Sequence, residues 1–243
     1  MNFSVFIENE DHHQYLKDKL KFSEPEITKI YPEQEPFFIY KEDGLHFVKD
    51  SSQNKLLHVD FLKGSLGWRL KRKDHETLLK KALGKKNNNL TIFDGTAGFL
   101  SDALIFLALG HKVIACEQSK VLFLLLSDAI DRAKIKLSFL DNLNLIHGDA
   151  LDVYKSMQNI DVIYLDPMYP SKKKSALTSA SMSDIKSILK LENIENLEDE
   201  VFFDFKKNKF KKIILKRPIK SKIIDDSFNY QIKGKSTRFD VYI

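Results

Sequence analysis

From Leu90 onward, the sequence alternates short apolar runs with longer stretches of helical length and composition. This alternation is the feature that most constrains the fold, because it is typical of parallel strands joined by crossover helices. It predicts an α/β fold, a doubly wound Rossmann-like sheet that ends in an antiparallel hairpin. The expected strands are residues 90–93, 112–116, 143–147, 162–165, 212–215, 228–232 and 238–243, and the expected helices are residues 99–109, 119–134 and 183–191.

The chain is expected to divide into three parts. Residues 1–54 contain Pro25, Pro32 and Pro36 and two short strand-like runs, at 3–7 and 36–40, which indicate a small α+β lobe. Residues 55–89 form a basic connecting segment, and residues 90–243 form the Rossmann-like domain. Charge differs along the chain: residues 1–54 carry 6 Lys and Arg against 11 Asp and Glu, whereas residues 171–243 carry 17 against 10.

Composition excludes several classes of protein. A chain of 243 residues with 43% hydrophobic and 30% charged residues is typical of a folded, soluble protein. Its longest apolar runs are far shorter than the roughly 18 residues that a membrane-spanning helix needs. The acidic start of the chain does not resemble a secretory signal, and the single Cys116 allows no intrachain disulfide. A cytoplasmic protein without membrane contact is therefore expected.

A glycine-rich loop, Asp-Gly-Thr-Ala-Gly at residues 94–98, directly follows the first strand of the predicted domain. In open parallel sheets, ligands bind at the carboxyl ends of the strands, where glycines such as Gly95 and Gly98 allow close approach of the backbone. The loop matches neither the dinucleotide fingerprint nor the P-loop. Asp94 suits a cationic ligand such as S-adenosylmethionine better than a pyrophosphate. A purely structural glycine turn is an equal alternative.

Two more acids follow the next two predicted strands. Glu117 can accept hydrogen bonds from both hydroxyls of a ribose; the alternative is a solvent-facing acid at the start of a helix. Asp149, in the segment His-Gly-Asp-Ala, is placed to receive an adenine amino group or a backbone donor. It can equally be an ordinary helix cap.

The strongest chemical signal is Asp-Pro-Met-Tyr at residues 166–169, directly after an apolar strand. It resembles the [D/N]-P-P-[Y/F] motif of methyltransferases that modify exocyclic amines. Such an amine is a poor nucleophile because its lone pair is conjugated with the ring. Asp166 and the Pro167 carbonyl can accept both amino hydrogens and orient the nitrogen, while Tyr169 can stack on an extruded base. The alternative is a proline-rich strand exit without catalytic function.

The longer stretch LDPMYPSKKKSAL at residues 165–177 closely resembles the RsmJ family of bacterial small-subunit rRNA guanine-N2 methyltransferases. Further matches are HVDF, DGTAG, LIHGDAL, LKRP and KGKSTRFDVY, so the resemblance covers about residues 56–243. It implies a class I methyltransferase fold and S-adenosylmethionine as cofactor. The chain departs from the family pattern at Leu100 and Ser101, where a glycine and an arginine are usual, and at Gln118, where a basic residue is common. The implied cofactor contacts are Ser101, Asp102, Glu117, Gln118, Asp149, Ala150 and Asp166.

Basic residues in the connecting segment, directly after the predicted catalytic motif and at the end of a later strand are candidates for RNA contacts, because lysine and arginine can hold phosphates, including those beside a flipped nucleotide. A solvated basic surface is the alternative. The candidate set is Arg69, Arg72, Lys172, Lys173, Lys174, Lys216 and Arg217.

The predicted function is methyl transfer from S-adenosylmethionine to the N2 amine of a guanine in 16S ribosomal RNA, with that RNA or the small ribosomal subunit as partner. The alternatives are an amino methyltransferase for another base or nucleic acid, and an inactive RNA-binding or ribosome-assembly factor with the same fold. No histidine or cysteine spacing typical of a metal site is present, so no metal is expected.

Overall fold

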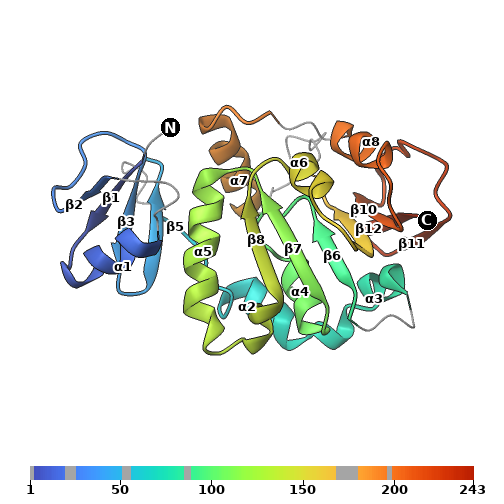
Figure 1. Cartoon of the computed structure of the whole chain (residues 1–243), viewed down its shortest axis with the longest axis horizontal. Helices are drawn as coiled ribbons and strands as arrows, with labels where there is room; N and C mark the ends of the chain where they lie inside the picture. The colour runs from blue at the N-terminus through green and yellow to red at the C-terminus, as the bar shows by residue number, and fades with distance from the viewer. Residues whose placement is uncertain (1–2, 20–25, 51–55, 85–88, 168–179, 196–198) are drawn as a thin grey trace.

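The computed structural model describes residues 3–19, 26–50, 56–84, 89–167, 180–195 and 199–243. These residues form two β-sheets, one of five strands in the order β2-β1-β3-β4-β5 and one of seven in the order β11-β12-β10-β9-β6-β7-β8. In Figure 1 the smaller sheet lies at the left, beside helix α5.

The smaller sheet is built by the first part of the chain. β1 runs parallel to β2 and β3, and β3, β4 and β5 follow one another antiparallel. β5 lies beyond the lobe boundary expected at residue 54, and it belongs to this sheet because it pairs with the edge of β4. The elements are β1 (Ser4–Ile7), α1 (Asp11–Lys19), β2 (Glu26–Thr28), β3 (Phe37–Lys41), β4 (Gly44–Val48) and β5 (Leu56–His58).

The larger sheet confirms the predicted doubly wound arrangement. β10, β9, β6, β7 and β8 are parallel neighbours, and β12 pairs antiparallel with both β10 and β11. All four residues of β9 are buried, as expected for a strand covered on both faces. The strands are β6 (Thr91–Asp94), β7 (Lys112–Glu117), β8 (Leu143–His147), β9 (Val162–Leu165), β10 (Ile213–Pro218), β11 (Tyr230–Lys233) and β12 (Thr237–Tyr242).

Helices join these strands and cover the sheet. The predicted helix at 119–134 is confirmed, with the Ser119 side chain capping it by accepting a hydrogen bond from Leu122 N at 3.1 Å. Among the described residues, none of the helices is long and apolar enough to cross a membrane. The helices are α2 (Gly64–Lys71), α3 (Thr77–Leu83), α4 (Ala103–Ala108), α5 (Lys120–Lys134), α6 (Ala150–Lys155), α7 (Ala180–Leu191) and α8 (Glu200–Lys206), with short 3-10 turns at Lys73–His75 and Ser138–Asn142.

Helix α4 begins later than the helix predicted from residue 99. The loop before it contains two residues in the left-handed region, Gly98 with φ +50° and Leu100 with φ +57°. These conformations are incompatible with a helix. The loop after β6 is therefore longer than the sequence pattern indicates.

The smaller sheet packs against α5 through the turn between β3 and β4. The Asp128 carboxylate accepts hydrogen bonds from Leu45 N at 3.0 Å and from Arg132 Nε at 2.7 Å. Gly44 adopts φ +116°, and a Cβ there would lie 2.3 Å from Arg132 Nε. The close approach of this turn to α5 therefore requires glycine at this position.

Candidate active site

The glycine-rich loop after β6 is tied to the end of β9. Asp94 is 2% exposed, and its Oδ1 accepts hydrogen bonds from the backbone and hydroxyl of Thr96 at 3.0 and 3.3 Å. The Thr96 hydroxyl in turn accepts one from Asp166 N at 2.7 Å. A Cβ on Gly95 would lie 3.0 Å from Leu165 Cδ2. This tight packing holds the loop and the start of the Asp-Pro-Met-Tyr motif together.

Glu117 ends β7 beside this loop. Its two oxygens accept hydrogen bonds from Ser119 N at 2.8 Å and from Gly98 N at 3.1 Å. Burial raises the pKa of Glu117 to about 8, against the effect of these two donors. Burial likewise raises the pKa of Asp94 to about 7.

These two buried carboxyls fit S-adenosylmethionine as a ligand. Burial disfavours their ionised forms, and a nearby cation or hydroxyl donors would favour them. S-adenosylmethionine carries a sulfonium, an amino group and two ribose hydroxyls, so it supplies both. The two carboxyls therefore supply hydrogen-bond acceptors and negative charge that match the donors and the cation of the cofactor.

Asp166 follows β9 and forms an ion pair with Lys216 on β10. Lys216 Nζ lies 2.8 Å from Asp166 Oδ2 and 2.7 Å from Asp102 Oδ2. Burial raises the pKa of Asp166, while Lys216 opposes that rise. The Asp166 side chain is 36% exposed, so a ligand can reach it.

Asp102 lies at the centre of this network. It is 6% exposed, accepts a hydrogen bond from the Tyr164 hydroxyl, and pairs with Arg69 Nη2 at 2.6 Å. Burial alone would raise the pKa of Asp102, but Lys216 and Arg69 outweigh it and lower the pKa to about 2. The Asp102 carboxylate binds these two cations, and the cofactor contact expected for Asp102 stays a prediction.

The other expected cofactor residues lie near the same edge with different surroundings. Ser101 is exposed, and its carbonyl accepts a hydrogen bond from Arg69 Nη1 at 2.9 Å. Gln118 is exposed directly after Glu117. Asp149 caps α6, because its Oδ1 accepts hydrogen bonds from Leu151 N and Asp152 N at 2.9 and 3.0 Å, and Ala150 is the first residue of that helix. The helix-cap role considered for Asp149 is the one present in this structure.

The expected RNA contacts separate into two groups. Arg69 and Lys216 belong to the Asp102 network described above, and Arg217 is 4% exposed, with its guanidinium paired to Asp199. These three side chains pair with carboxylates on other elements, which periodicity could not predict, and their expected RNA contacts stay predictions. Arg72 is exposed, and its guanidinium lies over the ring of Trp68, 4.9 Å from the centroid.

Part of the predicted site lies outside the described residues. Pro167 is described and buried, whereas Tyr169, Lys172, Lys173 and Lys174 fall in the undescribed segment 168–179.

Two features of this region were missed by the sequence analysis. Glu192, directly after α7, accepts hydrogen bonds from Lys120 N at 3.0 Å and from the Ser119 hydroxyl, at the start of α5. Trp68 is 62% exposed. A lone tryptophan in a basic segment was a signal for Trp68, but no local pattern pairs Glu192 with a helix start so distant in sequence.

Comparisons with known proteins agree with this geometry. A family described as "Putative SAM-dependent methyltransferase" matches residues 23–243. Relatives named "Ribosomal RNA small subunit methyltransferase J" include one from Desulfotalea psychrophila, 35% identical over 84% of this chain and 82% of the relative. Another, from Bdellovibrio bacteriovorus, is 31% identical over 87% of this chain and 83% of the relative.

The solved structure of a SAM-dependent methyltransferase from Neisseria gonorrhoeae is 25% identical to this chain, with a TM-score of 0.74 over 99% of this chain and 95% of that one. The class I methyltransferase fold predicted from the sequence is confirmed. Because both the family model and these relatives cover most of its length, the chain belongs to the ribosomal RNA small subunit methyltransferase J family of S-adenosylmethionine-dependent methyltransferases.

Proposed function

We propose that this enzyme transfers a methyl group from S-adenosylmethionine to the exocyclic N2 amine of a guanine in 16S ribosomal RNA, in the cytoplasm. The observation that carries the proposal is the position of Asp166. It follows a buried strand, its backbone is tied to the glycine-rich loop through Thr96, and its carboxylate is accessible. A carboxylate that can accept the hydrogens of an amine thus lies beside the glycine-rich loop, where the buried carboxyls suit S-adenosylmethionine.

In this proposal each residue at the sheet edge has a separate task. The Asp166 carboxylate and the Pro167 carbonyl accept the two amino hydrogens. This favours a pyramidal nitrogen, whose lone pair points at the methyl group and is no longer conjugated with the ring. Tyr169 stacks on the extruded base. Glu117 holds the ribose, and residues 94–98 surround the methionine end. When bound, the cofactor would supply an electrophilic methyl group on a good leaving group, so no covalent enzyme intermediate is needed, and the surplus amine proton would leave to water or to Asp166.

Lys216 has a positioning role in this proposal. Its ammonium bridges Asp166 and the buried Asp102, which is itself held by Arg69 and Tyr164. The bridge fixes the Asp166 carboxylate in place and favours its ionised form, which accepts hydrogen bonds without donating one. This role replaces the RNA contact expected for Lys216.

The proposed RNA surface combines Trp68 on α2 and Arg72, directly after α2, with Lys172, Lys173 and Lys174. Helix α2 adjoins the reaction site through Arg69, which contacts Asp102. An exposed aromatic ring beside a guanidinium suits an unpaired RNA base and its phosphate. The 16S RNA, alone or within the small subunit, is the proposed partner.

The test is methylation of small-subunit RNA, naked and in particles from a strain lacking the gene, followed by nucleoside mass spectrometry. We expect N2-methylguanosine with the wild type. Asp166→Ala should lower the rate about 100-fold or more, because orientation of the amine is lost, while cofactor affinity changes far less. Asp152→Ala, which removes a carboxylate with a 79% exposed side chain on α6, is the matched control and should keep full activity.

Other outcomes separate the alternatives. A methyl group found on a different nucleoside would keep the assignment as an amino methyltransferase and change the proposed substrate. Wild-type turnover by Asp166→Ala would overturn the role of Asp166. Cofactor binding without turnover on either RNA form would contradict the proposed substrate.

A further inference from the structure

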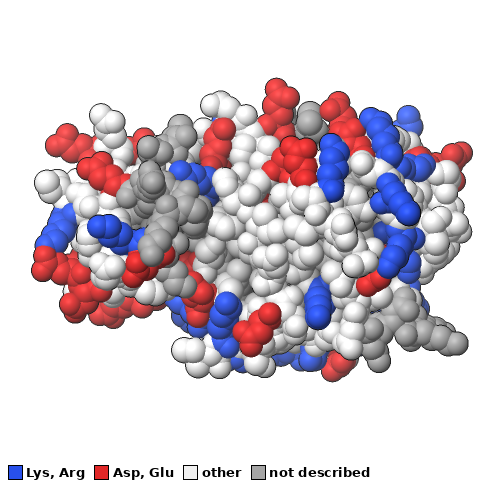
Figure 2. All heavy atoms as spheres, in the orientation of Figure 1, with Lys and Arg blue, Asp and Glu red and all other residues white. Residues whose placement is uncertain are grey.

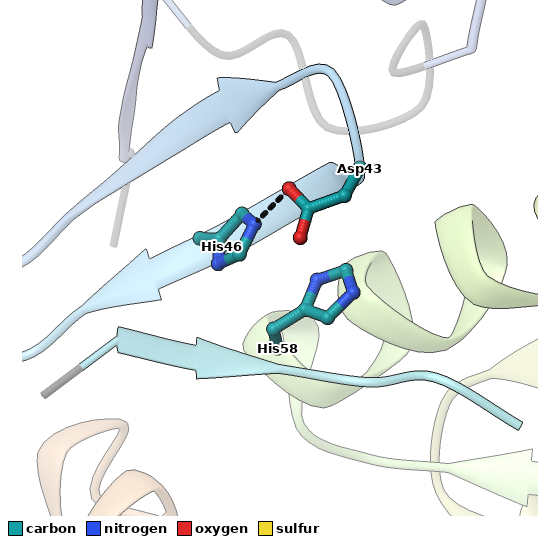
Figure 3. Close-up of side chains that lie close together, drawn as sticks. All are labelled: Asp43, His46 and His58. Atoms are coloured by element: carbon teal, nitrogen blue, oxygen red, sulfur yellow. Dashed lines mark hydrogen bonds and ion pairs between the residues drawn. The ribbon is translucent and has the colours of Figure 1, made fainter. Parts of the chain in front are cut away.

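Three side chains of the smaller sheet, none of them part of the reaction site, lie together at its edge. Asp43 belongs to the turn between β3 and β4, His46 to β4 and His58 to β5. Each offers one oxygen or nitrogen atom, and these atoms all lie within 4.8 Å of one another. Figure 3 shows the Asp43 carboxylate directed toward both imidazoles.

Strand pairing explains why residues so far apart in sequence meet. His46 and His58 are direct partners in the antiparallel ladder of β4 and β5. Side chains at such positions leave the same face of a sheet with their Cβ atoms about 5 Å apart. The imidazoles accordingly stack, with ring centroids 4.3 Å apart and planes 17° from parallel. The twelve-residue separation matches no sequence motif for a metal, which is why the sequence analysis expected none.

The hydrogen bonds of this cluster show which nitrogens carry protons. His46 Nε2 donates to Asp43 Oδ1 at 2.8 Å, so a metal ion would have to displace that proton. His58 Nδ1 lies 3.1 Å from the carbonyl oxygen of Leu45, and since a carbonyl only accepts, Nδ1 carries the proton and Nε2 a lone pair. In metal-bound histidines, the ring nitrogen that does not bind the metal commonly donates a hydrogen bond to a backbone carbonyl, as His58 Nδ1 does here. His46 is 7% exposed, and its Nδ1 has no partner within the described part of the chain.

We propose that Asp43, His46 and His58 bind one divalent transition-metal ion of the zinc class. Two imidazoles and one carboxylate are a donor set that Zn²⁺ and its neighbours accept, whereas Mg²⁺ and Ca²⁺ prefer oxygen ligands alone. The Asp43 side chain is 57% exposed, so water can complete the coordination shell. For both imidazoles to bind one ion, the stacked rings must rotate so that their lone pairs converge.

The position of the ion suggests a structural role. β5 has only three residues and forms the edge of its sheet. A metal bound by His46 and His58 cross-links this strand to β4. The same region packs on α5, because Leu45 N donates to Asp128 and Arg132 Nη2 donates to the carbonyl of Val59. The ion therefore strengthens the smaller sheet where it meets the methyltransferase domain.

The test uses the full chain, stripped with a chelator and dialysed. Titration with Zn²⁺ by calorimetry should show one saturable site, and Co²⁺ should give a visible absorption band typical of nitrogen and oxygen ligands. Zn²⁺ should raise the melting temperature in a concentration-dependent manner. His58→Gln and Asp43→Asn, which change partly or largely exposed side chains, should abolish the Co²⁺ band and weaken Zn²⁺ binding at least tenfold.

A matched control removes a histidine elsewhere. His75→Gln changes an exposed histidine after α2 and should leave the Co²⁺ band and Zn²⁺ affinity unchanged. Circular dichroism and binding of S-adenosylmethionine show whether each variant is folded, independently of any metal. The proposal is overturned if the wild type binds no Zn²⁺, or if folded His58→Gln and Asp43→Asn variants bind it as tightly as the wild type.

Discussion

At the scale of single residues, the sheet edge that matches the cofactor, at the carboxyl ends of the parallel strands, contains carboxyl groups that the fold buries. Glu117 is 6% exposed, and burial raises its pKa to about 8. A glutamate in an unfolded chain titrates near pH 4.3. The folded protein without cofactor therefore holds a proton on Glu117 over a pH range in which the unfolded chain has already released it.

This difference predicts a pH dependence of stability. Because the folded pKa exceeds the unfolded one, the contribution of Glu117 is fully present below about pH 4 and is lost as the pH rises toward 8. The free energy of unfolding should fall across this window, by up to about 1.4 kcal/mol per pH unit for one proton. Glu117→Gln, which cannot ionise, should show a shallower fall. Urea denaturation at several pH values without cofactor measures both slopes, and parallel curves would contradict the prediction.

Leu100 combines two opposing contributions to stability. Its side chain is fully buried, but its backbone adopts φ +57°, a conformation that costs a residue with a Cβ about 1–2 kcal/mol. The glycine that the family resemblance led us to expect here would adopt this backbone without that cost.

Substitutions at Leu100 should therefore follow an unusual order. Leu100→Ala loses the buried side chain and keeps the strained backbone, at a cost of about 2–5 kcal/mol. Leu100→Gly loses the same packing but relieves the strain, so it should be about 1 kcal/mol more stable than the alanine variant. Chemical denaturation of the two variants measures this difference. An alanine variant as stable as the glycine variant would show that the loop is unstrained.

At the scale of elements, sequence periodicity predicted the strands and helices whose residue pattern depends on local burial. Runs such as Val162–Leu165 are apolar because both faces of the central sheet are covered, and the ends of parallel strands necessarily lie at one edge. The placement of Asp94, Glu117 and Asp166 in one region was therefore predictable. The late start of α4 was not, because it depends on a left-handed backbone at Leu100, a residue type that does not usually adopt it.

Contacts between distant elements account for the rest of what the sequence could not predict. Glu192 follows α7 and caps the start of α5, and Lys216 on β10 pairs with Asp102, the residue directly before α4. Both are charged residues that a linear pattern assigns to the surface. Their partners are set by the order of the strands in the sheet. Arg217 on β10 likewise pairs with Asp199, directly before α8, and its expected RNA contact stays a prediction.

At the scale of the whole molecule, charge is unevenly distributed. Acidic side chains gather on the smaller sheet at the left of Figure 2, while Lys and Arg side chains gather toward the right, over the C-terminal part of the chain. Such a field favours approach of a polyanion by one end of the molecule. The lysines at positions 172–174 follow the proposed catalytic motif in sequence.

This asymmetry allows a test of where the RNA binds. Replacing Lys172, Lys173 and Lys174 with alanine should weaken binding of small-subunit RNA and reduce the slope of log affinity against log salt by up to about 2, since each single-strand phosphate contact contributes about 0.7. A matched triple variant changes Lys112, Lys134 and Lys136, exposed residues at the opposite edge of the sheet, where β7 begins and α5 ends. It removes the same charge and should leave the slope nearly unchanged. Fluorescence anisotropy over a range of salt concentrations gives both slopes. Equal reductions in the two variants would show that net charge, rather than contacts beside the reaction site, governs RNA binding.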